Sequence, residues 1–216
     1  RHSISKMSHI HFAAAPEYRN RLIQLGENPN NVFCFGGLGV DAINRTKILS
    51  KYQLAKALNI ELGSPCFLIT YHPITLEQNY GIDCLDQIFE ALKFFPEAKV
   101  CFTSPNADTN SIILTNKIKN FEKNNYNAYL FSSMGQIKYY SCLKYFDAVI
   151  GNSSSGLLEA PSFQIPTINI GNRQNGRLKA DSVIDCELNS ESITKAIKLA
   201  LSPTFLEKIK MVKNPY

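Results

Sequence analysis

The sequence has no long hydrophobic run: none of its apolar stretches approaches the ~20 residues that a membrane-spanning helix requires. Its first residues, Arg1 to Lys6, lack the apolar segment of a secretory leader. We therefore expect a cytoplasmic protein that does not bind membranes. The hydrophobic content of 44% over 216 residues is enough for one large domain, or for one domain and part of another.

Metal-ligand patterns are also missing. The four histidines include His9 and His11, which a strand would place on one face, but no third ligand accompanies them. The six cysteines are irregularly spaced, and those within apolar stretches, such as Cys66 and Cys101, are typical of small buried residues in a reducing compartment. We expect no metal site and no cofactor.

The basic residues are not clustered into a large patch. The formal net charge of +5 is spread along the chain, which argues against a nucleic-acid partner. One local group, Arg173, Arg177 and Lys179, follows the last clear strand and could face a diphosphate. Solvated loop charge is the alternative interpretation, and we prefer it for Lys179.

An apolar strand, a polar loop and a segment of helical period repeat through most of the chain. The pattern predicts strands at Cys66–Tyr71, Val100–Thr103, Ala128–Phe131, Phe146–Ile150 and Thr167–Ile170. Helices are predicted at about 84–95, 109–123 and 135–145. Because parallel neighbours need a crossover connection, this alternation predicts an α/β fold, a doubly wound Rossmann-like parallel sheet with helices on both faces. Polar residues follow several of the strands, at the edge where such sheets bind ligands.

The most informative segment is Gly151–Ser162, which follows the fourth of these strands. Its small polar residues leave backbone N–H groups free at the start of a helix, where anions bind. Three serines from Ser153 to Ser155 add hydroxyl donors, Gly156 permits close backbone approach, and Glu159 could accept two hydroxyls of a ribose. A phosphate beside a ribose indicates a nucleotide. The alternative is a serine-rich N-cap in which Glu159 only favours the helix dipole.

The first sixty residues follow a different pattern. We predict a strand within Ser8–Ala13, a short helix over Glu17–Leu25, a strand over Val32–Phe35 and a long amphipathic helix over Ile43–Leu58. This is too little for an α/β domain, and the sequence begins without an initiator methionine. We therefore expect residues 1–45 to be the end of an incomplete N-terminal Rossmann-like domain, 46–64 a connecting helix and linker, and 65–216 a complete second domain.

Six separated segments resemble the UDP-N-acetylglucosamine 2-epimerase family in order and spacing. They are Arg1–His9, Phe35–Asp41, Tyr71–Pro73, Ser104–Asp108, Asn152–Ser162 and Gly171–Arg177. The resemblance implies two facing Rossmann-like domains of the glycosyltransferase-B type, with a UDP-sugar in the cleft and UDP held mainly by the second domain. It also implies that the N-terminal domain is missing from this chain and that the full-length protein is a homo-oligomer.

Two departures separate the branches of that family. The non-hydrolysing branch usually carries His-Arg-Arg-Glu where this chain has His72–Thr75, and Ser-Gly-Gly where it has Ser153–Ser155. Two segments of this chain, Ser153–Gly156 and Arg173–Arg177, resemble the corresponding motifs of the hydrolysing enzymes of sialic and related nonulosonic acid synthesis. The resemblance therefore implies hydrolysis of UDP-N-acetylglucosamine to UDP and N-acetylmannosamine. Alternatives within the family are a non-hydrolysing epimerase and a bacillosamine-type diacetamido sugar as substrate.

The resemblance also implies roles for individual residues. In this family, inversion at C2 proceeds by elimination of UDP to a glycal and re-addition at C1 and C2. His72 is then catalytic, acting on the leaving phosphate or as an acid, and Arg173 or Arg177 stabilises the growing negative charge. The implied substrate-binding set is Ser153, Ser154, Ser155, Gly156, Glu159, Asn106 and Arg177. The family's catalytic carboxylates lie in the first domain, outside this chain.

Other classes of protein share this architecture. A glycosyltransferase of the same fold would bind the nucleotide with the same strand, turn and acidic ribose ligand, but would transfer the sugar to an acceptor. A nucleotide-binding module without catalysis is a third reading.

Overall fold

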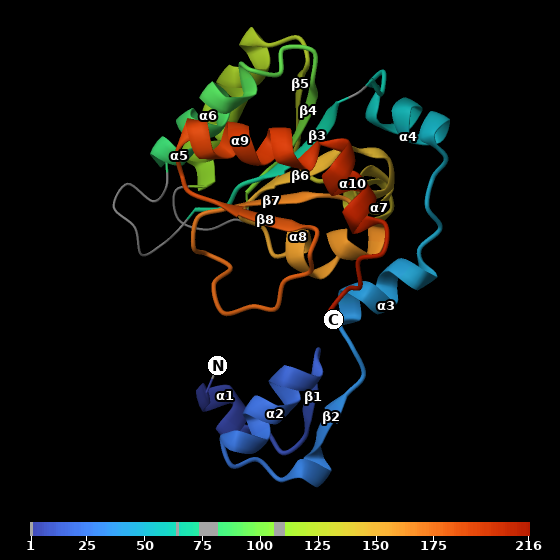
Figure 1. The fold of residues 1–216 in the computed structure, drawn as a ribbon, viewed down its shortest axis with the longest axis vertical. Coiled ribbons are helices and arrows are strands. Elements are labelled where there is room, and N and C mark those ends of the chain that lie inside the picture. The colour runs from blue at the N-terminus through green and yellow to red at the C-terminus, as the bar shows by residue number, and fades with distance from the viewer. Residues whose placement is uncertain (1, 64, 74–81, 106–110) are drawn as a thin grey trace.

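The computed structural model describes residues 2–63, 65–73, 82–105 and 111–216. Two parallel sheets organise these residues (Figure 1). A two-stranded sheet lies in the small N-terminal part, drawn in blue, and a six-stranded sheet lies in the larger part. Asn106, one of the expected substrate-binding residues, lies outside the described residues.

The N-terminal part contains α1 (His2–Met7), β1 (His11–Ala13), α2 (Pro16–Gln24), a 3-10 turn (Pro29–Asn31) and β2 (Val32–Cys34). The two strands pair in parallel, so the predicted strands and the helix between them are confirmed, although both strands are shorter. One face of this sheet is covered, and residues such as Val32 are buried on that face. The other face exposes Phe12 and Phe33, which are 73% and 38% accessible.

The predicted long helix over Ile43–Leu58 is wrong: the chain forms α3 (Leu38–Arg45) and α4 (Lys51–Leu58) instead. After α3, Thr46 has an extended backbone, with φ −87° and ψ 126°. A capping box then starts α4, because the Ser50 hydroxyl accepts the Gln53 N–H at 3.2 Å and Gln53 Oε1 accepts the Ser50 N–H at 3.0 Å. The apolar spacing continues through both helices, which is why a single helix was expected.

The large sheet is parallel throughout, in the order β5-β4-β3-β6-β7-β8. Its strands are β3 (Cys66–Thr70), β4 (Lys99–Thr103), β5 (Ala128–Phe131), β6 (Ala148–Gly151), β7 (Thr167–Ile170) and β8 (Val183–Cys186). The α/β prediction is therefore confirmed, with all five predicted strands present. The sixth strand, β8, was not predicted, because its residues are only partly buried and carry Asp185 within a short apolar run.

Helices cover both faces of the sheet (Figure 1). They are α5 (Ile82–Leu92), α6 (Ser111–Asn124), α7 (Gly135–Tyr145), α8 (Ser155–Leu158), the 3-10 turn η3 (Ala160–Phe163), α9 (Ser190–Ala200) and α10 (Pro203–Ile209). One apolar cluster joins alternate strand residues to α5, α6 and α9, and a second joins the opposite residues to α4 and α7. Each central strand is thus buried on both faces, as parallel sheets require.

The strand order places a topological switch point between β3 and β6. The chain runs from β3 outward to β4 and β5, then returns to the other side of β3 to form β6, β7 and β8. Loops that leave β3 and β6 therefore diverge to opposite faces and open a crevice at the carboxyl ends of these strands. This is where a ligand is expected.

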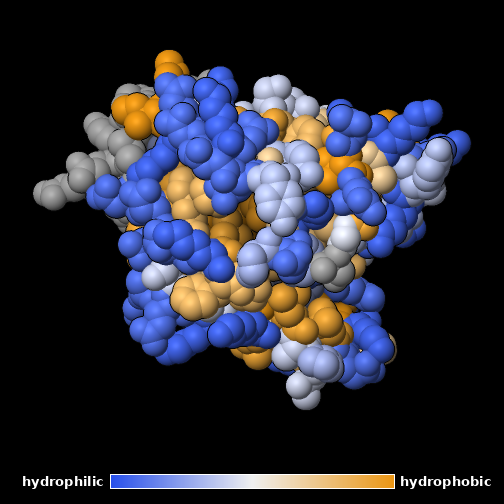
Figure 2. All heavy atoms as spheres, turned by 90° about the horizontal axis from the view of Figure 1, so that it is seen from above, coloured by the Kyte–Doolittle hydropathy of each residue, from blue (hydrophilic) through white to orange (hydrophobic). Residues whose placement is uncertain are grey.

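A cavity of about 680 Å³ lies at the opposite edge of the sheet, where the strands begin. Its lining is dominated by aromatic and aliphatic side chains, including Phe89, Phe95 and Phe121. Figure 2, viewed from above, shows apolar residues between polar ones on this side of the molecule. The cavity is remote from the crevice at the switch point.

Among the described residues, no helix has both the length and the hydrophobicity needed to span a membrane.

All six cysteines are unpaired thiols. Cys66 and Cys101 are buried as expected, whereas Cys34 is only half-buried.

Candidate functional site

The crevice begins where β3 and β6 end side by side. Gly151, the last residue of β6, has φ +133°, and a Cβ there would lie only 2.0 Å from the Thr70 carbonyl oxygen. Only glycine therefore permits this backbone geometry and this close approach. The two loops that leave the strands, at His72 and at Asn152, are consequently in direct contact.

A pocket of about 430 Å³ opens beside these loops. Its lining is mostly polar and comes from the carboxyl ends of β3, β4, β5 and β6 and from the start of α7. The described residues that line it are Thr70, His72, Thr103, Ser104, Ser132, Ser133, Met134, Gly135, Gln136, Tyr139, Tyr140, Ser153, Ser155 and Glu159. Hydroxyl groups supply most of its polar lining, so the pocket offers many hydrogen bonds to a polar ligand.

Glu159 carries the one carboxylate in that described lining. Its Oε2 is buried and has no hydrogen-bond partner. Burial raises the pKa of Glu159, and hydrogen bonding by the Ser155 hydroxyl partly opposes the increase. An unsatisfied buried acceptor is costly, so a ligand that donates hydroxyl hydrogens to this oxygen would relieve the cost.

The first turn of α3 packs against Glu159. A Cβ on Gly39 would lie 2.6 Å from Glu159 Oε1, so the carboxylate occupies the space that a side chain at position 39 would need. The Tyr140 hydroxyl donates to the Gly39 carbonyl oxygen at 3.3 Å and fixes this segment against α7. The position of Glu159 thus depends on α3 as well as on α8, which ends at this residue.

Ser155 is oriented by Tyr139. The Tyr139 hydroxyl donates to Ser155 Oγ at 2.8 Å. Burial raises the pKa of Tyr139 to about 12, so the phenol keeps its proton at neutral pH. Because Ser155 Oγ accepts this hydrogen bond, its own hydroxyl hydrogen remains available for Glu159 or for a ligand.

The helix that follows the serines is shorter than the sequence suggested. Helix α8 has only four residues, and Pro161 follows in the 3-10 turn η3, so Glu159 lies at the end of a single turn and not within a first turn of a long helix. A helix of this length has little macrodipole. Anion binding here would depend on hydroxyl groups and loop N–H groups.

His72 and Arg173 are joined through Asn152. Asn152 Oδ1 accepts the His72 N–H at 2.8 Å, and Asn152 Nδ2 donates to the His72 carbonyl oxygen at 2.9 Å. The Asn152 carbonyl oxygen in turn accepts from Arg173 Nη1 at 3.0 Å and from Gln174 Nε2 at 2.7 Å. The loops after β3, β6 and β7 therefore meet at one buried residue.

The structure brings four of the expected site residues into one pocket: His72, Ser153, Ser155 and Glu159. Two further expected residues, Ser154 and Gly156, lie in the same segment as Ser153 and Ser155. Ser154 precedes α8, and Gly156 is buried behind it, where a Cβ would lie 2.5 Å from Thr167 Cγ2. Gly156 thus permits close packing of α8 on β7, a contact with the sheet in addition to any contact with a ligand.

The two arginines do not line this pocket. Arg173 is exposed and donates to the Asn152 carbonyl oxygen, and Arg177 lies further along the loop. Lys179, for which we preferred solvated loop charge, forms an ion pair with Asp185 at 2.7 Å. His11 contacts Glu27 at 3.0 Å, as expected for a structural histidine. In the described part of the chain, no group of three or more potential ligands could hold a metal ion.

Sequence reasoning missed several residues of the site. Tyr139 and Gln136 project into the pocket from α7, and Asn152 lies beneath it. Sequence position could have indicated Gln136 and Tyr139. Ser132 and Ser133 follow the end of β5, and α7 begins directly after them, so its first residues lie at the same edge of the sheet. The role of Asn152 depends on a contact 80 residues away, which no local pattern reveals.

Comparisons with known proteins agree on one family. The sequence model described as UDP-N-acetylglucosamine 2-epimerase matches residues 1–216. The GDP/UDP-N,N'-diacetylbacillosamine 2-epimerase (hydrolyzing) of Campylobacter jejuni is 43% identical over 190 residues, covering 88% of this chain and 50% of the relative. Polysialic acid biosynthesis protein P7 of Escherichia coli is 38% identical over 220 residues, covering 100% of this chain and 55% of the relative. The chain spans about half the length of these curated relatives.

Solved structures show the same fold. S. aureus MnaA, in a co-structure with UDP, superposes with a TM-score of 0.76 at 16% identity, covering 99% of this chain and 56% of that one. The UDP-GlcNAc 2-epimerase of Neisseria meningitidis bound to UDP-GlcNAc gives 0.71 at 22% identity, covering 98% and 58%. The expected Rossmann-like fold of the glycosyltransferase-B type is thereby confirmed.

Proposed function

Because the chain belongs to the UDP-N-acetylglucosamine 2-epimerase family, we propose that it is the UDP-binding half of a hydrolysing epimerase that acts on UDP-N-acetylglucosamine. The products are UDP and N-acetylmannosamine. Two relatives support the hydrolysing branch: one carries "hydrolyzing" in its name, and the other is named for polysialic acid biosynthesis.

The observation that carries this proposal is the buried, unpartnered Oε2 of Glu159 in a pocket rich in hydroxyl groups. The two hydroxyls of a ribose are donors that suit a carboxylate at this position. Ser153 and Ser155 lie in the same pocket and can donate to a phosphate. A ligand that carries a ribose next to phosphates therefore fits the donor and acceptor pattern.

The reaction needs a base, a stabilised leaving group and a water molecule. Removal of the proton at C2 supplies the electrons that break the bond between C1 and the diphosphate oxygen, so UDP leaves and a glycal forms. Water then adds, with its hydroxyl on C1 and a proton on the opposite face of C2. UDP departs with extra negative charge on its diphosphate, which hydrogen-bond donors placed beforehand can stabilise.

His72 is the histidine that lines the pocket, and we assign it to the leaving diphosphate, as a hydrogen-bond donor or as an acid. Arg173, which is held by the Asn152 carbonyl oxygen, supplies positive charge, and Arg177 adds a second positive charge to the same loop. The serines and Glu159 hold the nucleotide and take no part in proton transfer at C2.

The base for C2 is proposed to lie in additional chain that completes the N-terminal part. Two features support this. The curated relatives are about twice as long as this chain. The two-stranded sheet of β1 and β2 also leaves Phe12, Phe33 and Phe35 stacked on an uncovered face, whereas parallel sheets in α/β proteins are covered on both faces. The 216-residue chain alone should therefore bind UDP without turning over UDP-sugars.

A diacetamido sugar is the second candidate substrate. It is favoured by the 43% identical relative, which is named as a diacetylbacillosamine 2-epimerase. The two candidates differ only at C4 and C6 of the sugar, so they share the UDP site proposed here.

Product analysis of the full-length enzyme tests the function. Incubated with UDP-N-acetylglucosamine and no acceptor, it should release UDP and N-acetylmannosamine in equal amounts. Accumulation of UDP-N-acetylmannosamine without free UDP would support a non-hydrolysing epimerase. Release of UDP only when an acceptor is added would support a glycosyltransferase. A higher kcat/KM for the UDP-linked diacetamido sugar would assign the second substrate.

A further inference from the structure

We propose that Asn152 is a positioning residue that fixes the His72 and Arg173 loops relative to each other at the switch point of the sheet. This inference rests on the proposed function, because it assigns a role in that reaction to a residue that is not among those lining the pocket. The side chain of Asn152 is fully buried, at 0% accessibility.

The Asn152 carboxamide pairs with both backbone polar groups of His72. It accepts the backbone N–H of His72 and donates to the backbone carbonyl of the same residue, at 2.8 Å and 2.9 Å. Only a group that carries an acceptor and a donor on one planar end can make both bonds. Aspartate has the same shape but lacks the donor, and an aliphatic side chain would leave both backbone groups of His72 without this partner.

The main chain of Asn152 extends the same network in two further directions. Its N–H donates to the Thr70 carbonyl oxygen at 3.2 Å, at the end of β3. Its carbonyl oxygen accepts from Arg173 at 3.0 Å and from Gln174 at 2.7 Å, in the loop after β7. Gln174 is itself buried, at 1% accessibility. The network therefore links the ends of three strands without a solvent-exposed bond at its centre.

This arrangement has a consequence for catalysis. His72 lines the pocket, and its backbone is held by the Asn152 side chain. A shift of about 1 Å in a catalytic group can lower the rate about 10²-fold even when the ligand still binds. Loss of the Asn152 contacts should therefore reduce turnover more than it reduces affinity for UDP.

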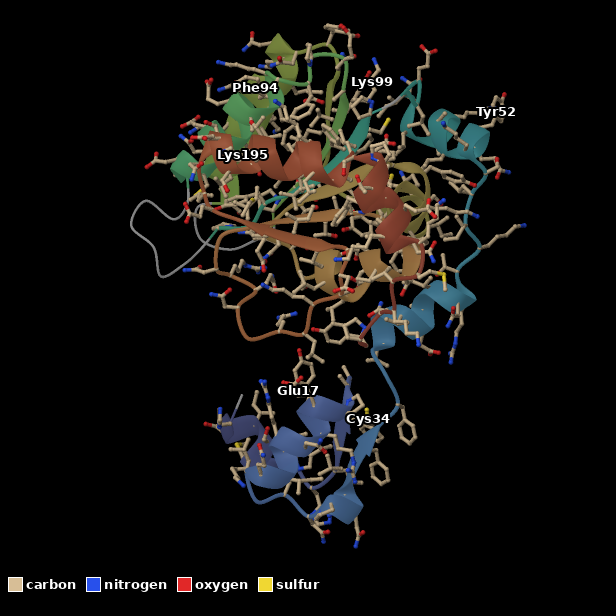
Figure 3. The ribbon with its side chains drawn as sticks, in the orientation of Figure 1. Glu17, Cys34, Tyr52, Phe94, Lys99 and Lys195 are labelled. Atoms are coloured by element: carbon tan, nitrogen blue, oxygen red, sulfur yellow. The ribbon has the colours of Figure 1, made fainter. Side chains whose placement is uncertain are left out.

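The primary variant is Asn152→Asp, which keeps the size and the acceptor and removes the donor. Its matched control is Asn127→Asp. Asn127 is also buried, at 7% accessibility; its Nδ2 donates to the Pro96 carbonyl oxygen at 3.1 Å and its Oδ1 accepts from Lys99. It lies at the amino edge of the sheet, lining the cavity opposite the candidate site; Lys99 is labelled in Figure 3.

In the full-length enzyme, Asn152→Asp should lower kcat about 10- to 100-fold, while the Kd for UDP changes less than about threefold. Asn127→Asp should leave kcat within about threefold of wild type at a similar loss of thermal stability. In a His72→Ala background, Asn152→Asp should cost little further activity, because two residues that act through one group are not additive.

A kcat for Asn152→Asp within threefold of wild type would overturn the inference, as would a loss of the same size in the His72→Ala background. If Asn152→Asp does not fold, Gln174→Met serves instead: it removes the hydrogen bond to the Asn152 carbonyl oxygen and should lower kcat about three- to tenfold, with UDP affinity retained. An unchanged kcat in that variant would equally contradict the inference.

Hydrogen exchange supplies a readout that does not need turnover. The His72 amide should exchange faster in Asn152→Ala, which removes the acceptor of its N–H, than in Asn127→Ala or wild type, and equal exchange would overturn the inference. Failure of the proposed function is a different result, in which wild-type enzyme releases no UDP from any UDP-sugar while the exchange difference persists.

Discussion

The sharpest prediction concerns the unpartnered oxygen of Glu159. Replacing Glu159 by glutamine keeps the size of the side chain but removes its charge and turns one acceptor into a donor. UDP affinity and the stability of the unliganded protein should respond differently. The variant should bind UDP more weakly, and the folded protein without ligand should be as stable as wild type or more stable at neutral pH, because a buried unpaired carboxylate is lost.

The loss of affinity can be estimated from the number of bonds. A hydrogen bond to a charged group contributes about 1.5–3 kcal/mol, and glutamine can replace part of one such bond. We expect the Kd for UDP to rise roughly 10- to 100-fold, which corresponds to about 1.4–2.8 kcal/mol. Isothermal titration of UDP into the 216-residue chain measures this directly. Glu191→Gln is the control, since that side chain is 77% exposed, on α9, and pairs only with Lys195 (Figure 3) at the surface.

The affinity should also depend on pH in a defined direction. Burial raises the pKa of Glu159 above its ordinary value of 4.5, so more of this group is protonated at mildly acidic pH than in an exposed glutamate. Ribose hydroxyls donate to the ionised form, so UDP affinity should increase as the pH rises through the raised pKa, with release of a proton on binding. In the unliganded protein the same shift opposes folding as the pH rises. The Glu159→Gln variant should lose both effects.

Two results would refute this reasoning. One is a Kd for UDP in Glu159→Gln within about twofold of wild type, with the fold intact. The other is a pH dependence of UDP affinity that persists unchanged in the variant. Either would show that Glu159 does not accept hydrogen bonds from the nucleotide.

Three further variants test other parts of the site. Gly39→Ala should displace the Glu159 carboxylate, whose Oε1 lies 2.6 Å from the added Cβ, and should weaken UDP binding about three- to tenfold; Gly63→Ala, which meets nothing within 4 Å, should not. Gly156→Ala should lower the free energy of unfolding by about 1–3 kcal/mol in thermal or urea denaturation, because its Cβ would overlap Thr167; an unchanged midpoint would show that α8 can move away from β7. In the full-length enzyme, His72→Ala should lower kcat about 10²- to 10⁴-fold with a much smaller rise in KM, and a loss below about tenfold would indicate a packing role.

Much of the fold could be predicted because its central elements are apolar and regular. The strands Ala128–Phe131 and Thr167–Ile170 and the helix Gly135–Tyr145 have the predicted bounds. The failures occurred where a polar contact outweighs periodicity. The capping box of Ser50 interrupts an otherwise continuous helical pattern. The short strand β8 has too few buried residues to be distinguished from a loop.

The candidate site was predictable only in part, for a related reason. His72, Ser153, Ser155 and Glu159 could be placed together because each follows or lies near the end of a predicted parallel strand. The sequence contains no sign that Asn152 spans two loops, since that depends on β3 and β6 being neighbours. It also does not reveal that Glu159 Oε2 is buried without a partner, which depends on how Gly39 packs against it.

The most direct test of the proposed reaction is deuterium incorporation at C2 of the sugar product. The full-length enzyme should convert UDP-N-acetylglucosamine in D2O, without an acceptor, to UDP and N-acetylmannosamine that carries one deuterium at C2, because the original proton is lost on elimination and replaced from solvent on re-addition. NMR spectroscopy or mass spectrometry of the released sugar measures this. Release of N-acetylglucosamine with its C2 proton retained would contradict the account, since it would show simple cleavage of the bond to UDP without epimerisation.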